Sequence, residues 1–502
     1  MTSTFSEFEA VIGLEVHVQL ATESKIFCGC RSRLETGQTL ADVRPNSRVC
    51  PVCSGQPGSL PVLNRKAVEF AIQAGLATEC QIAERSVFAR KNYFYPDLPK
   101  GYQISQFDEP LCLKGRIWIE GAHQTSRWVT IERIHMEEDA GKSVHSSDGT
   151  QINLNRAGTP LIEVVSAPEM HAPEEAGSYL RELYAIVTAI GVCDGNLQEG
   201  NFRCDANVSV RLRGSNQLGT RTEIKNVNSF RYVEKAIAYE IQRQVKLIRE
   251  GGGVRQETRL YDPDRDATFV LRSKEDAPDY RYFPEPDLPV LQVSPQWREA
   301  LRAKLPELPR QKRTRYQTHF GLSEYDTGVL TAEKELTEFF EAALLESTHL
   351  GLPLADAAKA VTNFLTQEIA RRMKEQDGAP MSAHLKPAHL AELVKRTREG
   401  ALSITGAKQV IGEIWLRGGE VEQVIQSKGL AQVSDIAALI PLVREVLNSC
   451  PVQVAEFKSG KEKVIGFLVG QIMKKSGGKA NPGMIQQLIR NELGQQQEET
   501  KS

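Results

Sequence analysis

The feature that most constrains the fold of this chain is a stretch of strict alternation near its N-terminus. Residues 12–20 place apolar side chains at every second position, with glycine or polar residues between them. A period of two indicates a β-strand that buries one face and presents the other. Glu15 and His17 therefore share a face. A carboxylate beside an imidazole on a strand is half of a divalent-metal site, or the solvated side of a sheet.

Further segments of the N-terminal half also carry acidic residues on short strand patterns. Crowded carboxylates repel one another, and divalent cations relieve that repulsion. Oxygen ligands with one imidazole suit Mg²⁺ or Mn²⁺ better than zinc, and bases nearby could hold phosphate oxygens. The combination predicts nucleotide-dependent phosphoryl transfer, with solvated strand faces as the alternative. The acidic residues are Glu137, Glu138, Glu163, Asp205 and Glu223, and the bases are Lys142, Arg156, Arg203 and Lys225.

Four of the nine cysteines lie in two close pairs. The pairs are Cys28-Gly29-Cys30 and Cys50-Pro51-Val52-Cys53. Two such pairs predict a closed tetrahedral zinc site, which leaves no open position and therefore has a structural role. The alternatives are a redox-active Cys50–Cys53 pair and a nucleophilic cysteine.

Length and pattern together predict an α+β protein of three domains. A chain of 502 residues is too long for one hydrophobic core. Short strands predict a catalytic domain over 1–292, with a zinc-binding insertion near 28–53, and helical periodicity predicts a helical domain over 293–408 and an all-α tail domain over 409–502. The sequence has no membrane-spanning run and no secretory signal, so we expect a cytoplasmic protein without a membrane partner.

Positive charge is local rather than general, because the net charge is −2. Two loops, 90–102 and 279–287, interleave bases with aromatic residues, which suits either base stacking or packing at a domain seam. The tail has a local excess of lysines, which predicts contact with an RNA backbone, with a solvated helix face as the alternative. The predicted tRNA-binding residues are Lys458, Lys461, Lys474 and Lys475.

Several long motifs, in one order from end to end, resemble those of the B subunits of bacterial-type aspartyl/glutamyl-tRNA(Asn/Gln) amidotransferases. These motifs are Gly13–Val18, Lys91–Asp97, Tyr102–Asp108, His135–Lys142, Asn155–Glu163, Arg203–Asn207, Asp279–Pro286 and Gly466–Lys474. The resemblance implies an antiparallel-sheet cradle of the glutamine-synthetase-like ligase type, a helical middle and a tail that contacts tRNA. It also implies a catalytic metal and phosphate pocket at Glu15, His17, Glu137, Glu138, Glu163, Asp205 and Glu223.

The resemblance further implies a ligase reaction. ATP phosphorylates the side-chain carboxylate of Glu or Asp misattached to tRNA(Gln) or tRNA(Asn), and ammonia then displaces phosphate. The implied cofactors are ATP, Mg²⁺ or Mn²⁺, and structural Zn²⁺. The chain shows no amidase or glutaminase signature, so the implied partners are an amidase subunit and a small third subunit in a heterotrimer, the misacylated tRNA, and a non-discriminating aminoacyl-tRNA synthetase.

Two other functions remain open on the sequence. One is a stand-alone ATP-dependent carboxylate–amine ligase that acts on a small amino acid, and the other is a non-catalytic, zinc-stabilised tRNA-binding protein. Release of ADP without tRNA would favour the first. The second predicts that Glu15→Ala leaves function intact, whereas changes at Lys474 and Lys475 abolish it.

Overall fold

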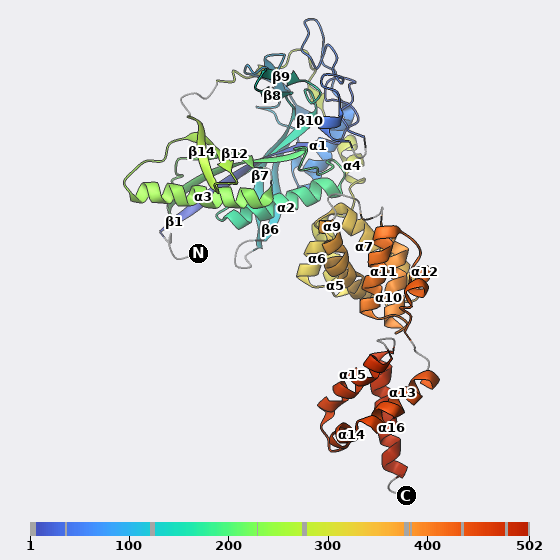
Figure 1. The fold of residues 1–502 in the computed structure, drawn as a ribbon. Coiled ribbons are helices and arrows are strands. Elements are labelled where there is room, and N and C mark those ends of the chain that lie inside the picture. Colours follow the sequence, from blue (N-terminus) through green and yellow to red (C-terminus); the bar gives the residue numbers. More distant parts are fainter. Residues whose placement is uncertain are drawn as a thin grey trace. The chain divides into compact units, whose positions relative to one another are not determined.

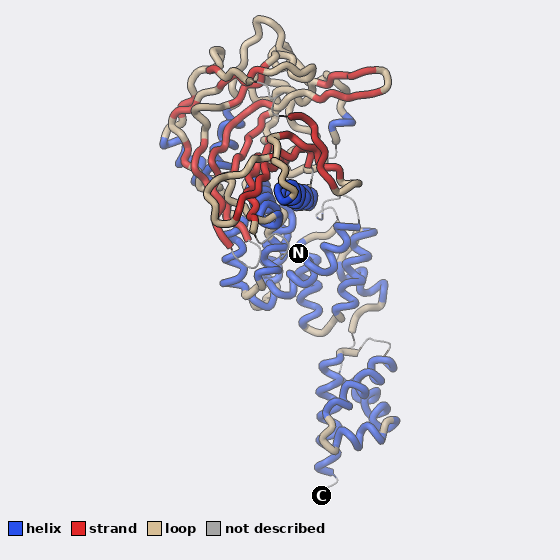
Figure 2. The backbone as a smooth tube through the Cα atoms, turned by 90° about the vertical axis from the view of Figure 1, so that its left-hand side faces the viewer, coloured by secondary structure: helices blue, strands red, loops and turns tan. Residues whose placement is uncertain are grey.

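The structure is a computed structural model that describes residues 7–35, 38–120, 126–227, 229–273, 279–375, 381, 384–432, 436–476 and 480–499. The chain divides into two compact units, residues 1–309 and 310–502. The first combines strands and helices and the second is helical, which confirms the predicted α+β class (Figures 1 and 2). Within the described residues, no helix is long and apolar enough to cross a membrane.

A large sheet forms the centre of the N-terminal unit, in the strand order β14-β13-β12-β11-β1-β10-β7-β6-β2. Strand β1 lies between β10 and β11 and pairs antiparallel with both. Neighbouring strands of this sheet pair antiparallel, except that β12 and β13 are parallel. The strands are β1 (Phe8–Gln19), β2 (Gln81–Ile82), β6 (Cys112–Glu120), β7 (Ser126–Glu138), β10 (Pro160–Ser166), β11 (Phe202–Leu212), β12 (Thr222–Val227), β13 (Glu257–Asp262) and β14 (Ala267–Ser273).

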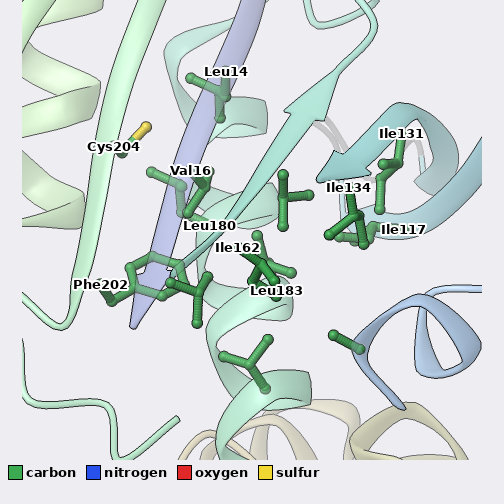
Figure 3. Close-up of a cluster of buried hydrophobic side chains, with 14 of the residues drawn as sticks. Leu14, Val16, Ile117, Ile131, Ile134, Ile162, Leu180, Leu183, Phe202 and Cys204 are labelled. Atoms are coloured by element: carbon green, nitrogen blue, oxygen red, sulfur yellow. The ribbon is translucent and has the colours of Figure 1, made fainter. Parts of the chain in front are cut away.

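The alternation of β1 gives the large sheet one buried face. Leu14 and Val16 are fully buried and belong to the same core as Leu180 and Leu183 of α2 (Figure 3). The helices that cover this face are α1 (Arg65–Ala77), α2 (Pro173–Ala189) and α3 (Phe230–Arg249), and each contributes buried residues to this core. Burial of apolar side chains at about 25 cal/mol per Å² stabilises this face. The polar residues of β1 consequently project from the opposite face.

Local signals set the ends of the covering helices. The Asn64 side chain accepts hydrogen bonds from the first backbone amides of α1, and the Ser229 side chain accepts one from the amide of Tyr232 in α3. Helix α2 begins at Pro173, whose missing amide costs nothing in the first turn. The sequence therefore determines where these helices meet the sheet.

Smaller elements complete the N-terminal unit. They are the sheet of β4 (Ala89–Asn92), β5 (Tyr102–Ser105) and β15 (Phe283–Pro284), the pair β3 (Arg85–Ser86) and β16 (Leu291–Gln292), the hairpin β8 (Lys142–Ser146) and β9 (Gly149–Asn153), the 3-10 helix Leu40–Asp42, and α4 (Pro295–Arg302). Leu301 of α4 belongs to the same core as β1, so this core continues beyond residue 292.

The C-terminal unit holds two separate apolar clusters. One extends from Tyr316 to Ile425 and the other from Leu439 to Leu493. The predicted domain limits stay predictions, although residue 408 falls inside α11, whose apolar residues pack in the first cluster. The helices are α5 (Pro309–Phe320), α6 (Glu324–Leu330), α7 (Lys334–His349), α8 (Leu354–Asn363), the π-helix Phe364–Ile369, α9 (Ala370–Glu375), α10 (Pro387–Arg398), α11 (Ile404–Arg417), α12 (Val421–Lys428), α13 (Ile436–Ser449), α14 (Pro451–Lys458), the 3-10 helix Glu462–Val464, α15 (Ile465–Lys475) and α16 (Pro482–Glu499).

Candidate active site

Strand register brings the acidic residues of four strands together on the open face of the large sheet. His17 of β1 lies directly opposite Glu163 of β10, and Glu163 lies opposite His135 of β7. On the other side of β1, Glu15 lies opposite Asp205 of β11. Directly paired residues share a face of a sheet. The alternation predicted from the sequence is therefore confirmed, and it places these side chains in one row.

The densest part of this row is a group of three side chains able to hold a cation. His17 Nε2 lies 3.2 Å from Glu163 Oε2 and 3.5 Å from Glu137 Oε1. Ligand atoms of the three residues all lie within 4.8 Å of one another. His135 adds a second imidazole, 3.7 Å from Glu163. One imidazole and two carboxylates match the ligands that Mg²⁺ or Mn²⁺ accepts.

The electrostatics of this group are those of a shared site. Burial lowers the pKa of His17, but its hydrogen bond to Glu163 and the charge of Glu137 outweigh burial and raise that pKa to about 9. Burial and the neighbouring charge of Glu163 raise the pKa of Glu137 to about 7. Burial lowers the pKa of His135 to about 4. The three groups therefore depart from their ordinary pKa values in different directions, as closely packed ionisable groups do.

A cavity of about 390 Å³ opens above the row of acidic residues. A second cavity of about 550 Å³ adjoins it and shares Glu15, Asn207, Arg221 and Gln256. Together they have the size of sites that hold cofactor-sized ligands. The charged residues that line the first cavity are Glu15, His17, Lys91, Arg133, His135, Glu163, Asp205, Arg221, Glu223, Lys225, Glu257 and Arg272.

The four predicted phosphate-holding bases lie in three different places. Lys225 lines the cavity, with its Nζ 2.8 Å from Asp205 and 3.0 Å from Glu223. Arg156 and Arg203 both bind the buried carboxylate of Asp139, at 3.1 and 3.2 Å. Lys142 lies exposed on β8 and does not line the cavity.

Glu138 is separated from the other predicted ligands by the alternation of β7. Its neighbour Glu137 contacts His17, whereas Glu138 contacts Lys100 and accepts a hydrogen bond from the Ile104 amide at 2.9 Å. Consecutive residues of a strand point to opposite faces. The structure therefore brings Glu15, His17, Glu137, Glu163, Asp205 and Glu223 to the open face, and Glu138 to the other side of β7.

The four cysteines of residues 28–53 form a compact cluster, as the sequence predicts. Their sulfur atoms lie within 4.8 Å of one another, and Cys53 Sγ lies 3.9 Å from those of Cys30 and Cys50. A tetrahedral centre with zinc–sulfur distances of about 2.3 Å has sulfurs about 3.8 Å apart. The hydrogen bond between Cys28 and Cys53 lowers the pKa of the Cys53 thiol and raises that of the Cys28 thiol, so it favours a thiolate, the form that metals bind, at Cys53. The cluster could therefore bind a metal ion and is compatible with structural zinc.

Comparison with known proteins decides the family. Residues 10–299 match the GatB/GatE catalytic domain and residues 339–493 match the GatB domain. The chain is 52% identical to the B subunit of the aspartyl/glutamyl-tRNA(Asn/Gln) amidotransferase of Geobacter sulfurreducens, over 97% of this chain and 99% of that protein. The corresponding B subunits of Trichlorobacter lovleyi and Thermodesulfovibrio yellowstonii are 51% and 49% identical, over 97% and 96% of this chain and 99% and 98% of their own lengths.

The chain belongs to this family. Membership confirms the resemblance seen in the sequence motifs, and it does not favour the stand-alone ligase or the non-catalytic RNA-binding protein. The acidic pocket falls entirely within the part of the chain that matches the catalytic domain.

Several residues of the pocket are absent from the predicted site. Arg133 and His135 precede Glu137 at every second position of β7, so the same alternation could have identified them. Lys91 comes from β4 of the small sheet, and Arg272 comes from β14. Lys91 belongs to the loop of bases and aromatic residues noted in the sequence, but nothing in that pattern places it beside the acidic strands. Arg272 lies in no motif noted in the sequence.

The predicted tRNA-binding lysines are exposed in the C-terminal part of the chain. Lys458 ends α14, Lys461 lies directly before the 3-10 helix, and Lys474 and Lys475 end α15. Lys461 pairs with Glu456, and Lys475 contacts Glu445. Their role in RNA binding stays a prediction.

Proposed function

We propose that this chain activates the side-chain carboxylate of Glu or Asp on misacylated tRNA(Gln) or tRNA(Asn) with ATP, and converts it to the amide. The observation that carries this proposal is the pocket of metal-competent and basic side chains within the catalytic domain of a family of tRNA amidotransferase subunits. The activity is that of a ligase that forms a carbon–nitrogen bond.

The reaction needs activation because a carboxylate would have to expel oxide when ammonia attacks it. In the first step the γ-phosphoryl group moves from ATP to a carboxylate oxygen, and ADP leaves. In the second step ammonia forms the new C–N bond, the C–O bond to phosphate breaks, and a nitrogen proton is lost. Each step develops negative charge on oxygen, which cationic groups stabilise.

The residues of the pocket fit this chemistry. Magnesium would be held by His17, Glu137 and Glu163, where it neutralises phosphate oxygens. Lys225, Arg221 and Arg272 line the same cavity and would bind phosphate or carboxylate oxygens through charge-assisted hydrogen bonds. Glu15, Asp205 and Glu223 add oxygen ligands, and the last two orient Lys225. The open sheet backed by helices supports a cradle of the glutamine-synthetase-like type.

Other subunits would supply the ammonia. The relatives are each named as one lettered subunit of an amidotransferase, which supports a multi-subunit complex with an amidase subunit and a small third subunit. The cysteine cluster would hold structural zinc, as the spacing of its sulfur atoms supports. The lysines at the ends of α14 and α15 would bind the tRNA backbone.

The test is formation of ADP by the purified chain with its partner subunits, Glu-tRNA(Gln), ATP, Mg²⁺ and ammonium ions. We expect ADP to form only when misacylated tRNA is present, together with Gln-tRNA(Gln). Release of ADP without tRNA would instead support the stand-alone ligase. Absence of tRNA-dependent ADP with all subunits present would overturn the proposed kinase role.

A further inference from the structure

Lys25 is a fully buried lysine beside the cysteine cluster. Its side chain has an exposed fraction of 0%. The ammonium Nζ donates to the backbone oxygens of Arg48 and Leu154, at 2.8 and 3.3 Å, and to Cys53 Sγ at 3.4 Å. These three contacts use all three donors of the ammonium group. In the part of the chain that the structure describes, Lys25 forms no ion pair with a carboxylate.

A buried ammonium is costly unless a negative charge lies beside it, and its two backbone carbonyl partners supply none, which leaves Cys53 as the contact that can carry one. A divalent metal bound by four thiolates carries a formal charge of −2, which is equally costly inside a protein. Each of these groups therefore supplies the charge that the other lacks. Contact between the ammonium and one of the four sulfurs is the geometry that such compensation requires.

We propose that Lys25 is the counter-cation of a metal centre formed by Cys28, Cys30, Cys50 and Cys53, and that it ties this centre to the loop that carries Arg156. This inference rests on the metal-binding role proposed above. Lys25 acts as a positioning residue, because it contacts a metal ligand and not the reacting atoms of the substrate.

Other contacts besides those of Lys25 connect the cysteine cluster to the loop that carries Arg156. The amide of Ile26 donates to the oxygen of Gly158 at 2.9 Å, and the amide of Gly158 donates to the oxygen of Asp139 at 2.9 Å. Gly158 has a φ of +80°, and a Cβ atom added there would lie 3.5 Å from Cβ of Cys53. The loop thus packs on the cysteine cluster at one side and on Asp139, the partner of Arg156, at the other.

The experiment first measures zinc in the wild-type chain, and then the rate of zinc release to a chromogenic chelator. Residues that hydrogen-bond to metal ligands typically change metal affinity by about 10–100-fold. We therefore expect Lys25→Met to release zinc at least about tenfold faster than wild type. Lys25→Gln keeps a donor without the charge, so it should also release zinc faster. Lys66→Met, which removes an exposed lysine of α1, is the matched control and should match wild type.

The outcomes separate the two proposals. A wild-type chain that binds no zinc overturns the metal assignment, whereas a zinc-bound Lys25→Met protein with wild-type release overturns the role of Lys25. Hydrogen exchange of the wild-type chain supplies a test that needs no variant to fold. Removal of zinc should accelerate exchange at the amides of Gly158 and Thr159, and unchanged exchange there would overturn the tie to the loop.

Discussion

The acidic pocket and the cysteine cluster are both groups of metal-ligating side chains, but the chain builds them in opposite ways. Ligands of the pocket lie on neighbouring strands, so the backbone hydrogen bonds of the sheet set their spacing. Ligands of the cluster lie between β1 and α1, where the 3-10 helix Leu40–Asp42 is the only helix or strand among the described residues. We therefore expect the sheet to hold the pocket in shape without a metal, and the cluster to need a bound metal to keep its shape.

The charges around the pocket and around the cluster differ as well. The pocket combines carboxylates with cations such as Lys225 and Arg272 and opens into a cavity, so ligands can exchange there. The cluster has Lys25 as its buried cation and four sulfurs that would complete a tetrahedron. Open coordination is typical of catalytic sites and closed coordination of structural ones. We therefore expect ligands on the strands of the sheet to serve catalysis and ligands on the loop to stabilise the fold.

The strongest test of this difference is Glu163→Gln in the pocket. Glu163 contacts both His17 and His135, so its charge is central to the proposed cation site. We expect the rate of tRNA-dependent ADP formation to fall by about 100-fold or more, because loss of one electrostatic group at a reacting centre has this magnitude. The melting temperature should change little. Glu120→Gln, at the exposed end of β6, is the control, and a Glu163→Gln enzyme of wild-type rate would contradict the assignment.

The cysteine cluster should show the reverse response, a loss of stability. Binding at a metal concentration about 100 times Kd contributes about 2.7 kcal/mol. Cys53→Ser should therefore lower the first thermal transition by roughly 5–10 °C, and a chelator should lower it similarly in wild type. Cys450→Ser lies outside the cluster and should keep the response to chelator. A chelator that leaves the wild-type Tm unchanged would argue against a metal-dependent fold.

Local patterns are sufficient to predict the parts of the site that lie on single strands. Period-two alternation places Glu15 and His17 on one face, and the same rule holds for Asp205 and Glu223. The cysteine spacing likewise predicts the cluster, because two close pairs bring their sulfurs together over a short loop. Such features depend on residues near one another in sequence, where geometry leaves few choices.

Other features depend on tertiary contacts that no local pattern carries. The sequence predicts that Arg156 and Arg203 hold phosphate, but both pair with Asp139, which lies outside the predicted site. Lys91 enters the pocket from a different sheet. Charge balance between distant segments decides these positions, and it becomes visible only in the folded chain.

Asp139→Asn tests whether the pocket and the cluster are coupled. Asp139 binds Arg203, which precedes Asp205 of the pocket by two residues, and Arg156, whose loop packs on Cys53. Loss of its charge leaves two guanidinium groups without their carboxylate. We expect kcat to fall about tenfold, which is the lower limit of the effect typical for residues that orient the groups of a metal site. The zinc content should not change. Asp148→Asn, in the exposed turn of β8 and β9, is the control; activity within twofold of wild type would indicate that the two regions are independent.

The smallest effect should come from Lys474→Ala combined with Lys475→Ala, which leaves both regions intact. These lysines end α15, and each contact with a phosphate adds nearly one unit to the slope of log K against log salt. We expect KM for the tRNA to rise roughly threefold at moderate salt, with a shallower salt dependence and an unchanged kcat, because the reacting centre is not altered. Lys334→Ala, on the exposed side of α7, removes a similar charge and should leave KM unchanged. A fall in kcat instead of a rise in KM would mean that the tail affects the chemistry in the pocket. The tail would then have to be counted with the pocket as part of the catalytic machinery.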